Sequence, residues 1–342
     1  MKIIKNNSKP NLLKKIFIKL CRIMGYEIID QNTFFVPTLN KPINSTLSIQ
    51  GKKSINLPLG EVKITRKVKS LDIIIRTCTN VKMLTQNKDR IFQEEKIEYT
   101  LRSVNSILKS VLDAKKIHQN IIFTIHLIDH NSSKANLDKI ENLLNKSNLH
   151  YKLLNLKIDE FKDKINPINQ KNENSTTNQI SNMCNIYKSL ELSRSSKDLI
   201  YFVEDDYIHE NQSISEMLFA YERIASLTKK DLIMCPTDYP FLYMKVDSTK
   251  LFLGENYHWR QINETLCTFL MSKQIVDKHW DKLTSMCKQE HYPFESPLHD
   301  IYKEETCISP VPSLSIHCTN INSAFGLSPN KDWKKLWEEN KV

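Results

Sequence analysis

Three consecutive carboxylates, Glu204, Asp205 and Asp206, follow directly on an apolar run at residues 199–203. Such a run, rich in β-branched and aromatic residues, predicts a strand buried on both faces of a parallel sheet. Adjacent carboxylates repel one another, and burying them unpaired is costly. A divalent cation would relieve the repulsion, because Mg²⁺ and Mn²⁺ prefer carboxylate oxygen and share their other positions with water and phosphate. The alternative is a solvated strand end whose acids pair with lysines.

The composition fits a globular enzyme and excludes two common nucleotide-binding loops. The chain has 342 residues, 40% of them hydrophobic, and only five glycines. No two glycines have the spacing of a Rossmann dinucleotide loop or a P-loop, which need glycine where the backbone approaches phosphate. The net charge of +10 would suit an anionic partner. Lysine is abundant along the whole chain, however, so the charge alone identifies no binding patch.

The cysteines and the apolar segments favour the reducing cytoplasm as the location. Eight cysteines are scattered without a C-x-x-C pair, which disfavours structural zinc and is typical of free thiols. The sequence contains no uninterrupted apolar stretch of about 18 residues, so we expect no transmembrane helix. The first residues also lack the apolar core of a secretory signal.

Residues 1–68 are expected to form an N-terminal extension. Apolar residues recur at helical spacing from Leu12 to Met24, basic residues fill the other face, and Gly25 ends the pattern. This helix could pack on the adjacent domain, which is the commoner arrangement. Alternatively, residues 10–24 could make a peripheral contact with an anionic membrane at its inner face. Residues 32–66 are predicted to be a strap or linker.

Residues 69–342 are expected to form one α/β domain. Strands predicted at 71–79, 121–128, 151–158 and 199–203 alternate with helices at 89–116, 135–145, 178–192 and 213–227, the last with Ser213 as N-cap and Glu216 in a capping box. This alternation predicts a mainly parallel sheet flanked by helices. Short strands and the helices 273–288 and 298–305 follow. We divide the domain into residues 69–207, residues 208–317 and a tail (318–342).

The stretch from about Leu71 to His317 resembles a GT-A fold glycosyltransferase of the family 2-like type, which uses nucleotide-sugar donors. Glu204-Asp205-Asp206 is similar to the family's D-x-D signature. The segment 128–133, Ile-Asp-His-Asn-Ser-Ser, resembles its acid-plus-serine turn, with Asn131 in place of the usual glycine. Residues 76–80 stand where such enzymes hold the nucleoside, and His299-Asp300 stands where they carry an acceptor-side acid.

The resemblance implies that residues 69–207 are a donor half and residues 208–317 an acceptor half, and it implies a role for each matching residue. Asp206 would bind Mn²⁺ or Mg²⁺, and His317 is a candidate further ligand or else an ordinary hydrogen-bonded histidine. Glu204 and Asp205 would contact the ribose or the metal's water. The remaining donor-binding candidates are Thr77 and Asp129 on the uridine side, Asn80 beside them, and Arg260 for the donor phosphate or an anionic acceptor. Asp129 could instead only shape a turn, and Arg260 could be a surface arginine.

Inverting sugar transfer also requires a general base for the acceptor hydroxyl. We choose Asp300, with His299 as a possible orienting group. The alternative role of Asp300 is to cap the following helix. The rivals are Glu264, Glu295 and Asp238, all in the acceptor half.

We therefore expect a metal-dependent, inverting glycosyltransferase of cell-surface polysaccharide synthesis. It would move sugar from a UDP- or GDP-sugar to a saccharide or glycolipid acceptor. A sugar nucleotidyltransferase is the first alternative, although the first strand lacks the glycine-rich loop that such chemistry uses. A basic, non-enzymatic protein binding membrane or nucleic acid is the second, although no nucleic-acid motif is present.

Overall fold

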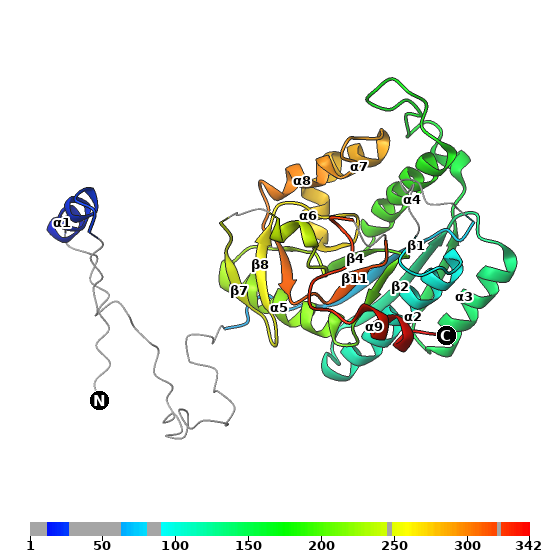
Figure 1. The fold of residues 1–342 in the computed structure, drawn as a ribbon, viewed down its shortest axis with the longest axis horizontal. Coiled ribbons are helices and arrows are strands. Elements are labelled where there is room, and N and C mark those ends of the chain that lie inside the picture. Colours follow the sequence, from blue (N-terminus) through cyan, green and yellow to red (C-terminus); the bar gives the residue numbers. More distant parts are fainter. Residues whose placement is uncertain (1–11, 27–62, 81–89, 245–247, 320–322) are drawn as a thin grey trace. The chain divides into compact units, whose positions relative to one another are not determined.

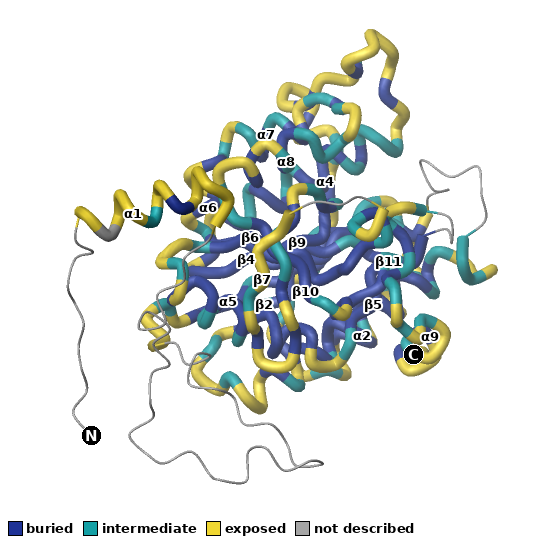
Figure 2. The backbone as a smooth tube through the Cα atoms, turned by 60° about the vertical axis from the view of Figure 1, so that its left-hand side comes forward, coloured by how far each residue is buried: buried dark blue, intermediate teal, exposed yellow. Residues whose placement is uncertain are grey.

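The computed structural model describes residues 12–26, 63–80, 90–244, 248–319 and 323–342 (Figure 1). The chain divides into two units, residues 1–61 and 62–342. In the first unit, helix α1 covers Leu12–Ile23, as the apolar periodicity predicts, and all its large apolar side chains except that of Ile18 are exposed (Figure 2). Most of the predicted strap lies outside the described residues. Among the described residues, no helix has both the length and the apolar content needed to cross a bilayer.

A nine-stranded sheet forms the centre of the second unit, in the order β3-β2-β1-β4-β9-β6-β10-β8-β7. The bounds are β1 (Ser70–Thr77), β2 (Ile122–Asp129), β3 (Tyr151–Asn155), β4 (Leu199–Glu204), β6 (Ile233–Met234), β7 (Leu251–Leu253), β8 (His258–Ile262), β9 (Phe269–Ser272) and β10 (Cys307–Val311). The strands β3, β2, β1 and β4 are all parallel. In the other half only β6 and β10 pair in parallel. The α/β class is confirmed.

Helices cover both faces of this sheet (Figure 1). One face carries α2 (Lys96–Ile117), α3 (Lys134–Lys146) and α5 (Ser213–Thr228). The other carries α4 (Thr177–Ser193), α6 (Lys273–Lys278), α7 (Trp280–Lys288) and α8 (Ser296–Tyr302). Two short 3-10 helices, η3 (Ile158–Phe161) and η4 (Pro240–Tyr243), lie in connections. The chain ends with α9 (Trp333–Glu339).

The central strands are buried on both faces because their alternate residues enter two different cores. In β4, Tyr201 and Val203 join the core beneath α2 and α5, whereas Ile200 and Phe202 join the core beneath α4 and α7. This explains why the strand has no polar alternation. It also fixes where its carboxylates emerge, since β4 runs parallel to β1 and Arg76 pairs with Glu204 in register.

Two predicted helix starts differ from the structure. The helix expected from residue 89 begins at Lys96. At the start of α5, Gln212 is the N-cap and Ser213 is the first helical residue, with its hydroxyl donating to the Leu314 carbonyl at 2.6 Å. Glu216 accepts from the Trp259 indole at 3.2 Å instead of closing a capping box. Tertiary partners thus outcompete the local cap.

A small second sheet ties the C-terminal tail to the domain. Strand β5 (Tyr207–His209) pairs antiparallel with β11 (Ser315–His317) directly after the acidic segment. Behind it, Trp337 of α9 is buried and stacks on Phe92 with ring centroids 3.8 Å apart. The Arg102 guanidinium lies 4.3 Å from the Trp337 ring. The tail is therefore part of the core.

We expect Trp337→Ala to lower the free energy of unfolding by about 3–5 kcal/mol, because it empties this aromatic cluster. Urea denaturation followed by circular dichroism measures the change. Glu338→Ala, at an exposed site on the same helix, is the matched control and should change stability by no more than about 0.5 kcal/mol. Equal stability of the two variants would contradict the packing described.

Candidate active site

Two of the three carboxylates at the end of β4 are held by cations from neighbouring elements. Glu204 pairs with Arg76 of β1, with 3.1 Å between Oε1 and Nη2. Asp205 pairs with Lys96 at the start of α2, with 2.5 Å between Oδ1 and Nζ. Asp205 also accepts from the Thr100 hydroxyl at 2.8 Å. These pairs remove much of the repulsion that the sequence pattern poses.

The third carboxylate, Asp206, faces a histidine. His317 at the end of β11 places Nε2 3.7 Å from Asp206 Oδ2. Its ring stacks on Tyr207 at 4.5 Å between centroids, and its Nδ1 lies 2.7 Å from the Phe325 carbonyl. A carbonyl can only accept, so Nδ1 carries a proton and the variable proton lies on Nε2.

The local charges set the protonation of this pair. Burial acts to raise the pKa of Asp206, but Lys96 and His317 outweigh it and hold the pKa well below its usual range. Burial acts to lower the pKa of His317, and the Asp206 charge overcomes it, so the pKa is raised. Asp206 is therefore ionised at neutral pH, and the histidine favours its charged form beside it.

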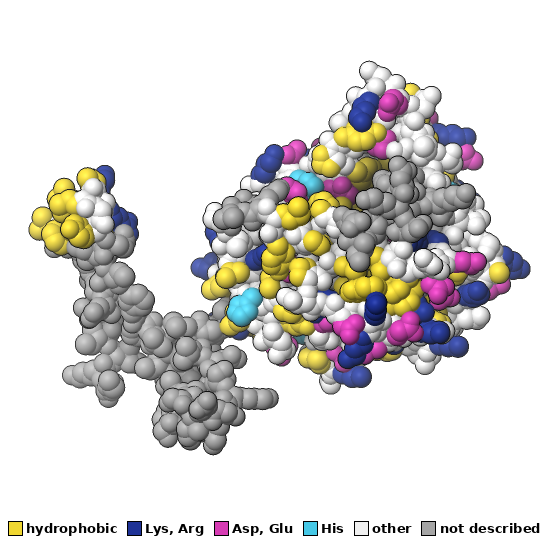
Figure 3. Space-filling model, in the orientation of Figure 1, with side chains coloured by type: hydrophobic (Ala, Val, Ile, Leu, Met, Phe, Trp, Pro, Cys, Tyr) yellow, Lys and Arg dark blue, Asp and Glu magenta, His cyan; other side chains and the backbone are white. Residues whose placement is uncertain are grey.

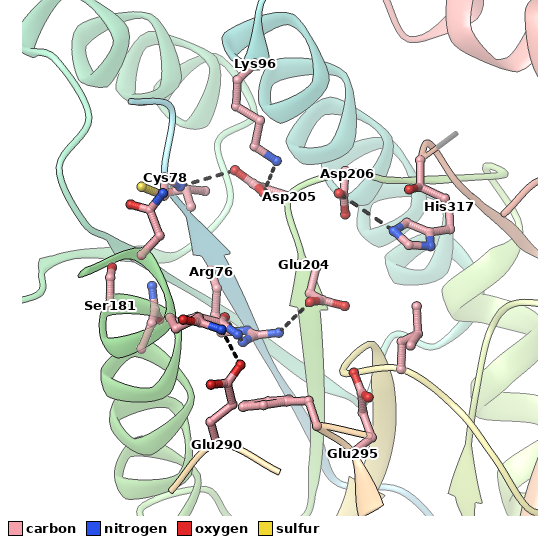
Figure 4. Close-up of a pocket in the computed structure, with 18 of the residues that line it drawn as sticks. Arg76, Cys78, Lys96, Ser181, Glu204, Asp205, Asp206, Glu290, Glu295 and His317 are labelled. Carbon is pink, nitrogen blue, oxygen red and sulfur yellow. Dashed lines mark hydrogen bonds and ion pairs between the residues drawn. The ribbon is translucent and has the colours of Figure 1, made fainter. Parts of the chain in front are cut away.

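All three acids line one cavity of about 520 Å³ (Figure 4). Lys96, Asp205, Asp206 and His317 lie toward one end, and Glu290 and Glu295 toward the other. The Arg76–Glu204 pair lies between the two ends. The cavity thus joins an end where carboxylates face Lys96 and His317 to an end with the carboxylates of Glu290 and Glu295.

Glu295, the N-cap residue of α8, is the carboxylate with the most altered acidity at the second end. Burial, followed by the charge of Glu204, raises its pKa to about 7. The Cys267 thiol lies 3.9 Å from its Oε1. A carboxyl with a pKa near neutrality can exchange a proton with a substrate hydroxyl, as a general base must.

Amide and hydroxyl side chains of α4 form another wall of the cavity. Asn178, Ser181, Asn182 and Asn185 recur at helical spacing and all line it. Thr176 begins α4 with a complete capping box in which Gln179 is the partner. The same Gln179 amide donates to Glu290, so the cap also holds the 290–295 segment. Such a wall suits a ligand rich in hydroxyl groups.

The preceding polar segment, residues 166–176, is hydrogen-bonded to the cavity wall. The Asn169 amide donates to the Tyr292 hydroxyl at 2.9 Å. The Gln289 amide donates to the Ile168 carbonyl at 3.1 Å. Tertiary hydrogen bonds therefore position this segment despite its lack of periodicity.

Asp206 and His317 fit a divalent cation held jointly with a ligand. Their 3.7 Å separation suits two groups binding one ion from different sides. Because Nδ1 donates to a carbonyl, Nε2 is the nitrogen that would bind, and the ion would displace the Nε2 proton. Among the described residues, no group of three or more His, Cys, Asp and Glu side chains forms a complete cage. Phosphate and water would have to complete the sphere, as they do at many Mg²⁺ sites.

The structure brings together only part of the predicted set. Five predicted residues line the cavity, namely Thr77, Glu204, Asp205, Asp206 and His317. Four do not lie among its described lining, namely Asn80, Asp129, Arg260 and Asp300.

Asp129 supports the site from behind. It is buried and accepts from the Thr77 hydroxyl at 2.8 Å and the Ser132 hydroxyl at 2.6 Å. Asn131 has φ of 61°, the left-handed conformation that asparagine tolerates and glycine favours. Asn131 can therefore stand in this turn where the resembling family has glycine. Asp129 thus orients Thr77 without reaching the cavity.

Asp300 and Arg260 are occupied elsewhere. Asp300 is 55% exposed and pairs with Lys303 at 2.6 Å. It is also not the residue that caps α8, since Glu295 precedes that helix. Arg260 pairs with the buried Asp238, and its guanidinium lies 4.5 Å from the Tyr243 ring. The base and phosphate roles expected of these two residues have no support in their positions.

Several lining residues are absent from the sequence prediction. Arg76 stands in the 76–80 segment expected to hold the nucleoside but is given no role of its own. Lys96 stands inside a helix expected to start earlier. Glu290 and the α4 amides carry no motif. Glu295 is named only as a rival base. It lies five residues before Asp300, and the sequence pattern does not show which of these two acids faces the cavity.

Comparison with known proteins gives structural but not sequence matches. No family model and no curated protein matches the chain. Among solved structures, an active-site mutant of LgtC is 11% identical, over 70% of this chain and 72% of that one, with a TM-score of 0.34. Mouse xyloside xylosyltransferase 1 is 11% identical, over 68% and 76%, with a TM-score of 0.36. LgtC, described as a galactosyltransferase in complex with donor and acceptor sugar analogues, is 12% identical, over 68% and 65%, with a TM-score of 0.29. The overlap of the backbones is partial, so the proposal below rests on the cavity.

We expect the raised pKa of Glu295 to make the protein less stable as pH rises. A carboxyl with a folded pKa of about 7 binds its proton more tightly in the folded than in the unfolded state. Its contribution is therefore full at low pH and is lost as pH rises through about 7. Urea denaturation gives the free energy of unfolding at pH 5 and at pH 8. Its decrease between these two pH values should be about 2 kcal/mol smaller in Glu295→Gln than in the wild type.

The exposed acid of the same helix supplies the matched control. Asp300→Asn should keep the pH dependence of the wild type between pH 5 and pH 8, because the pKa of Asp300 is already lowered by Lys303. If Glu295→Gln followed the wild-type curve instead, Glu295 would have ordinary acidity.

Proposed function

We propose that the protein is a glycosyltransferase that moves a sugar from a nucleotide-sugar donor to a hydroxyl-bearing acceptor. The observation that carries this proposal is the cavity itself, which joins Asp206 and His317 at one end to the near-neutral Glu295 at the other. A group that can hold a cation and a group that can accept a proton are the two requirements of sugar transfer from a diphosphate.

The donor diphosphate would lie at the end formed by Lys96, Asp206 and His317. Lys96 keeps its positive charge, because the charges of Asp205 and Asp206 outweigh the effect of burial and raise its pKa. Thr77 and Cys78, at the end of β1, line the same cavity and would contact the nucleoside. We assign a UDP- or GDP-sugar as donor.

Mn²⁺ or Mg²⁺, held by Asp206, His317 and the diphosphate, would supply the Lewis acid that neutralises the leaving group. Glu204 and Asp205 would then not bind the metal directly, since they already pair with Arg76 and Lys96. Their role would be to position these two cations beside the donor. The two ion pairs keep the strand end rigid while the donor binds.

Glu295 takes the base role in place of Asp300. The acceptor oxygen would attack the anomeric carbon, the bond from that carbon to the diphosphate oxygen would break, and the acceptor proton would pass to the Glu295 carboxylate. A single displacement of this kind inverts the anomeric configuration. The acidic wall and the α4 amides would hold the acceptor.

We further propose a saccharide or glycolipid as the acceptor, in synthesis of a cell-surface polysaccharide in the cytoplasm. The wall of amide and hydroxyl groups from α4 supports a hydroxyl-rich acceptor. The free state of all eight cysteines is compatible with a reducing compartment.

We expect Asp206→Asn to lower turnover of a nucleotide sugar by at least about 100-fold, because the variant loses the charge that holds the cation. Thermal unfolding with Mn²⁺ and either UDP or GDP gives an independent readout. At about 100-fold over its Kd, the nucleotide should stabilise the wild type by about 2.7 kcal/mol, and the shift should vanish in the variant.

Asp300→Asn is the control for that experiment and should keep both turnover and the thermal shift. If no nucleoside diphosphate shifts the melting temperature with or without metal, the donor site is not here. A shift that survives in Asp206→Asn would remove the metal from the proposal and leave Lys96 and Arg76 to bind phosphate.

We expect Glu295→Gln to separate chemistry from donor binding. Turnover should fall about 10²- to 10⁴-fold, the usual contribution of a general base, while the thermal shift with nucleotide and metal stays. In the wild type, kcat/KM should rise with pH toward a plateau above about 7, because only the ionised carboxylate accepts a proton. Product analysis by NMR reports the anomeric configuration, and retention would exclude the single displacement.

A further inference from the structure

The N-terminal helix has two faces of opposite character. Six of its large apolar side chains are exposed, with Phe17 at 59% and Ile23 at 75%. At about 100° per residue, the apolar positions 12, 13, 16, 17, 20, 23 and 24 occupy an arc of about 140°, whereas the partly buried Ile18 lies outside this arc. Figure 3 shows the apolar side chains of α1 on one side and its basic side chains on the other. An exposed apolar stripe of this kind needs a partner.

The charge of the segment selects the partner. Seven of the chain's 49 Lys and Arg residues lie within residues 1–26, and none of its 39 Asp and Glu residues does. Most of the net charge of +10 therefore comes from this short segment. The basic residues Lys15, Lys19 and Arg22 lie together beside one edge of the apolar arc. A surface that offers apolar depth beneath a layer of negative charge matches both faces at once.

The length of α1 defines how such a surface is used. Twelve residues extend about 18 Å, whereas crossing a bilayer takes about 20 apolar residues. A helix of this kind lies in the plane of the interface, with its apolar face in the acyl boundary and its cations at the phosphates.

We propose that α1 binds the surface of a membrane that contains anionic lipid, and so holds the catalytic unit at the bilayer. The partner is the lipid surface itself, recognised by apolar burial together with negative headgroups. This inference is independent of sugar transfer, since it concerns binding by residues 12–23 and no residue of the cavity.

The test is sedimentation of the full-length protein with vesicles. We expect strong binding to phosphatidylcholine vesicles containing about 30 mol% phosphatidylglycerol, weak binding to phosphatidylcholine alone, and weaker binding at about 0.5 M NaCl. The triple variant Lys15→Gln/Lys19→Gln/Arg22→Gln should reduce the partition constant about 100-fold. The double variant Phe17→Ser/Leu20→Ser should reduce it at least about tenfold.

A charge-matched control separates the helix from net charge. Lys162→Gln/Lys303→Gln/Lys335→Gln removes three lysines whose side chains are 70%, 76% and 69% exposed on the catalytic unit. This variant should bind vesicles as the wild type does. Equal loss in the control and in the α1 charge variant would overturn the proposal, because binding would then follow total charge.

Two further outcomes would also overturn it. If the Phe17→Ser/Leu20→Ser variant lowered the melting temperature of the catalytic unit, the apolar face would pack on that unit. If the same substitutions converted a dimer into a monomer in analytical ultracentrifugation, the partner would be a second copy of the chain. Turnover with a water-soluble acceptor should be unchanged in the α1 variants, so that a failure of vesicle binding and a failure of catalysis are read separately.

Discussion

The site depends on how three carboxylates can be crowded at the end of one buried strand. β4 delivers Glu204, Asp205 and Asp206 to a single edge, where the parallel neighbour β1 and the start of α2 supply Arg76 and Lys96. Each cation neutralises one acid and leaves Asp206 to face His317. Removing either cation would leave a carboxylate unpaired in a low-dielectric site, which is costly. The charge arrangement is therefore a condition of the fold as well as of the chemistry.

The same constraint explains why the site combines elements far apart in the chain. The three acids can be neutralised only if β1, α2 and β11 all reach the end of β4. β11 is held there by the two-stranded sheet with β5, and the Trp337 cluster holds the tail behind it. The other end of the cavity is built differently, from the N-terminal cap of α8 and the capping box of α4. A rigid charged end thus faces a wall assembled from helix starts.

The sequence allowed the framework to be predicted because its signals are local. The run at 199–203, the alternation of strands with helices and the apolar period of residues 12–23 all reflect burial patterns that neighbouring residues express directly. Asn131 in a left-handed turn follows from local chemistry as well. The predicted N-cap of α5 was wrong because Ser213 and Glu216 hydrogen-bond to Leu314 and Trp259, which are far away in the sequence. Contacts of that kind leave no trace in spacing.

The choice between Asp300 and Glu295 shows where reading a site from sequence reaches its limit. Both are acids in one short segment, and both stand near the place where an acceptor-side acid is expected. Five residues of helix turn the chain by about 140°, and α8 buries Leu298 and Ile301 against the core. That burial directs Asp300 outward to Lys303, while Glu295 at the helix start stays on the cavity. Which of the two acids lines the cavity therefore depends on which face of the seven-residue helix α8 is buried. So few residues do not define that face in the sequence, and it is set only when the helix packs on the core.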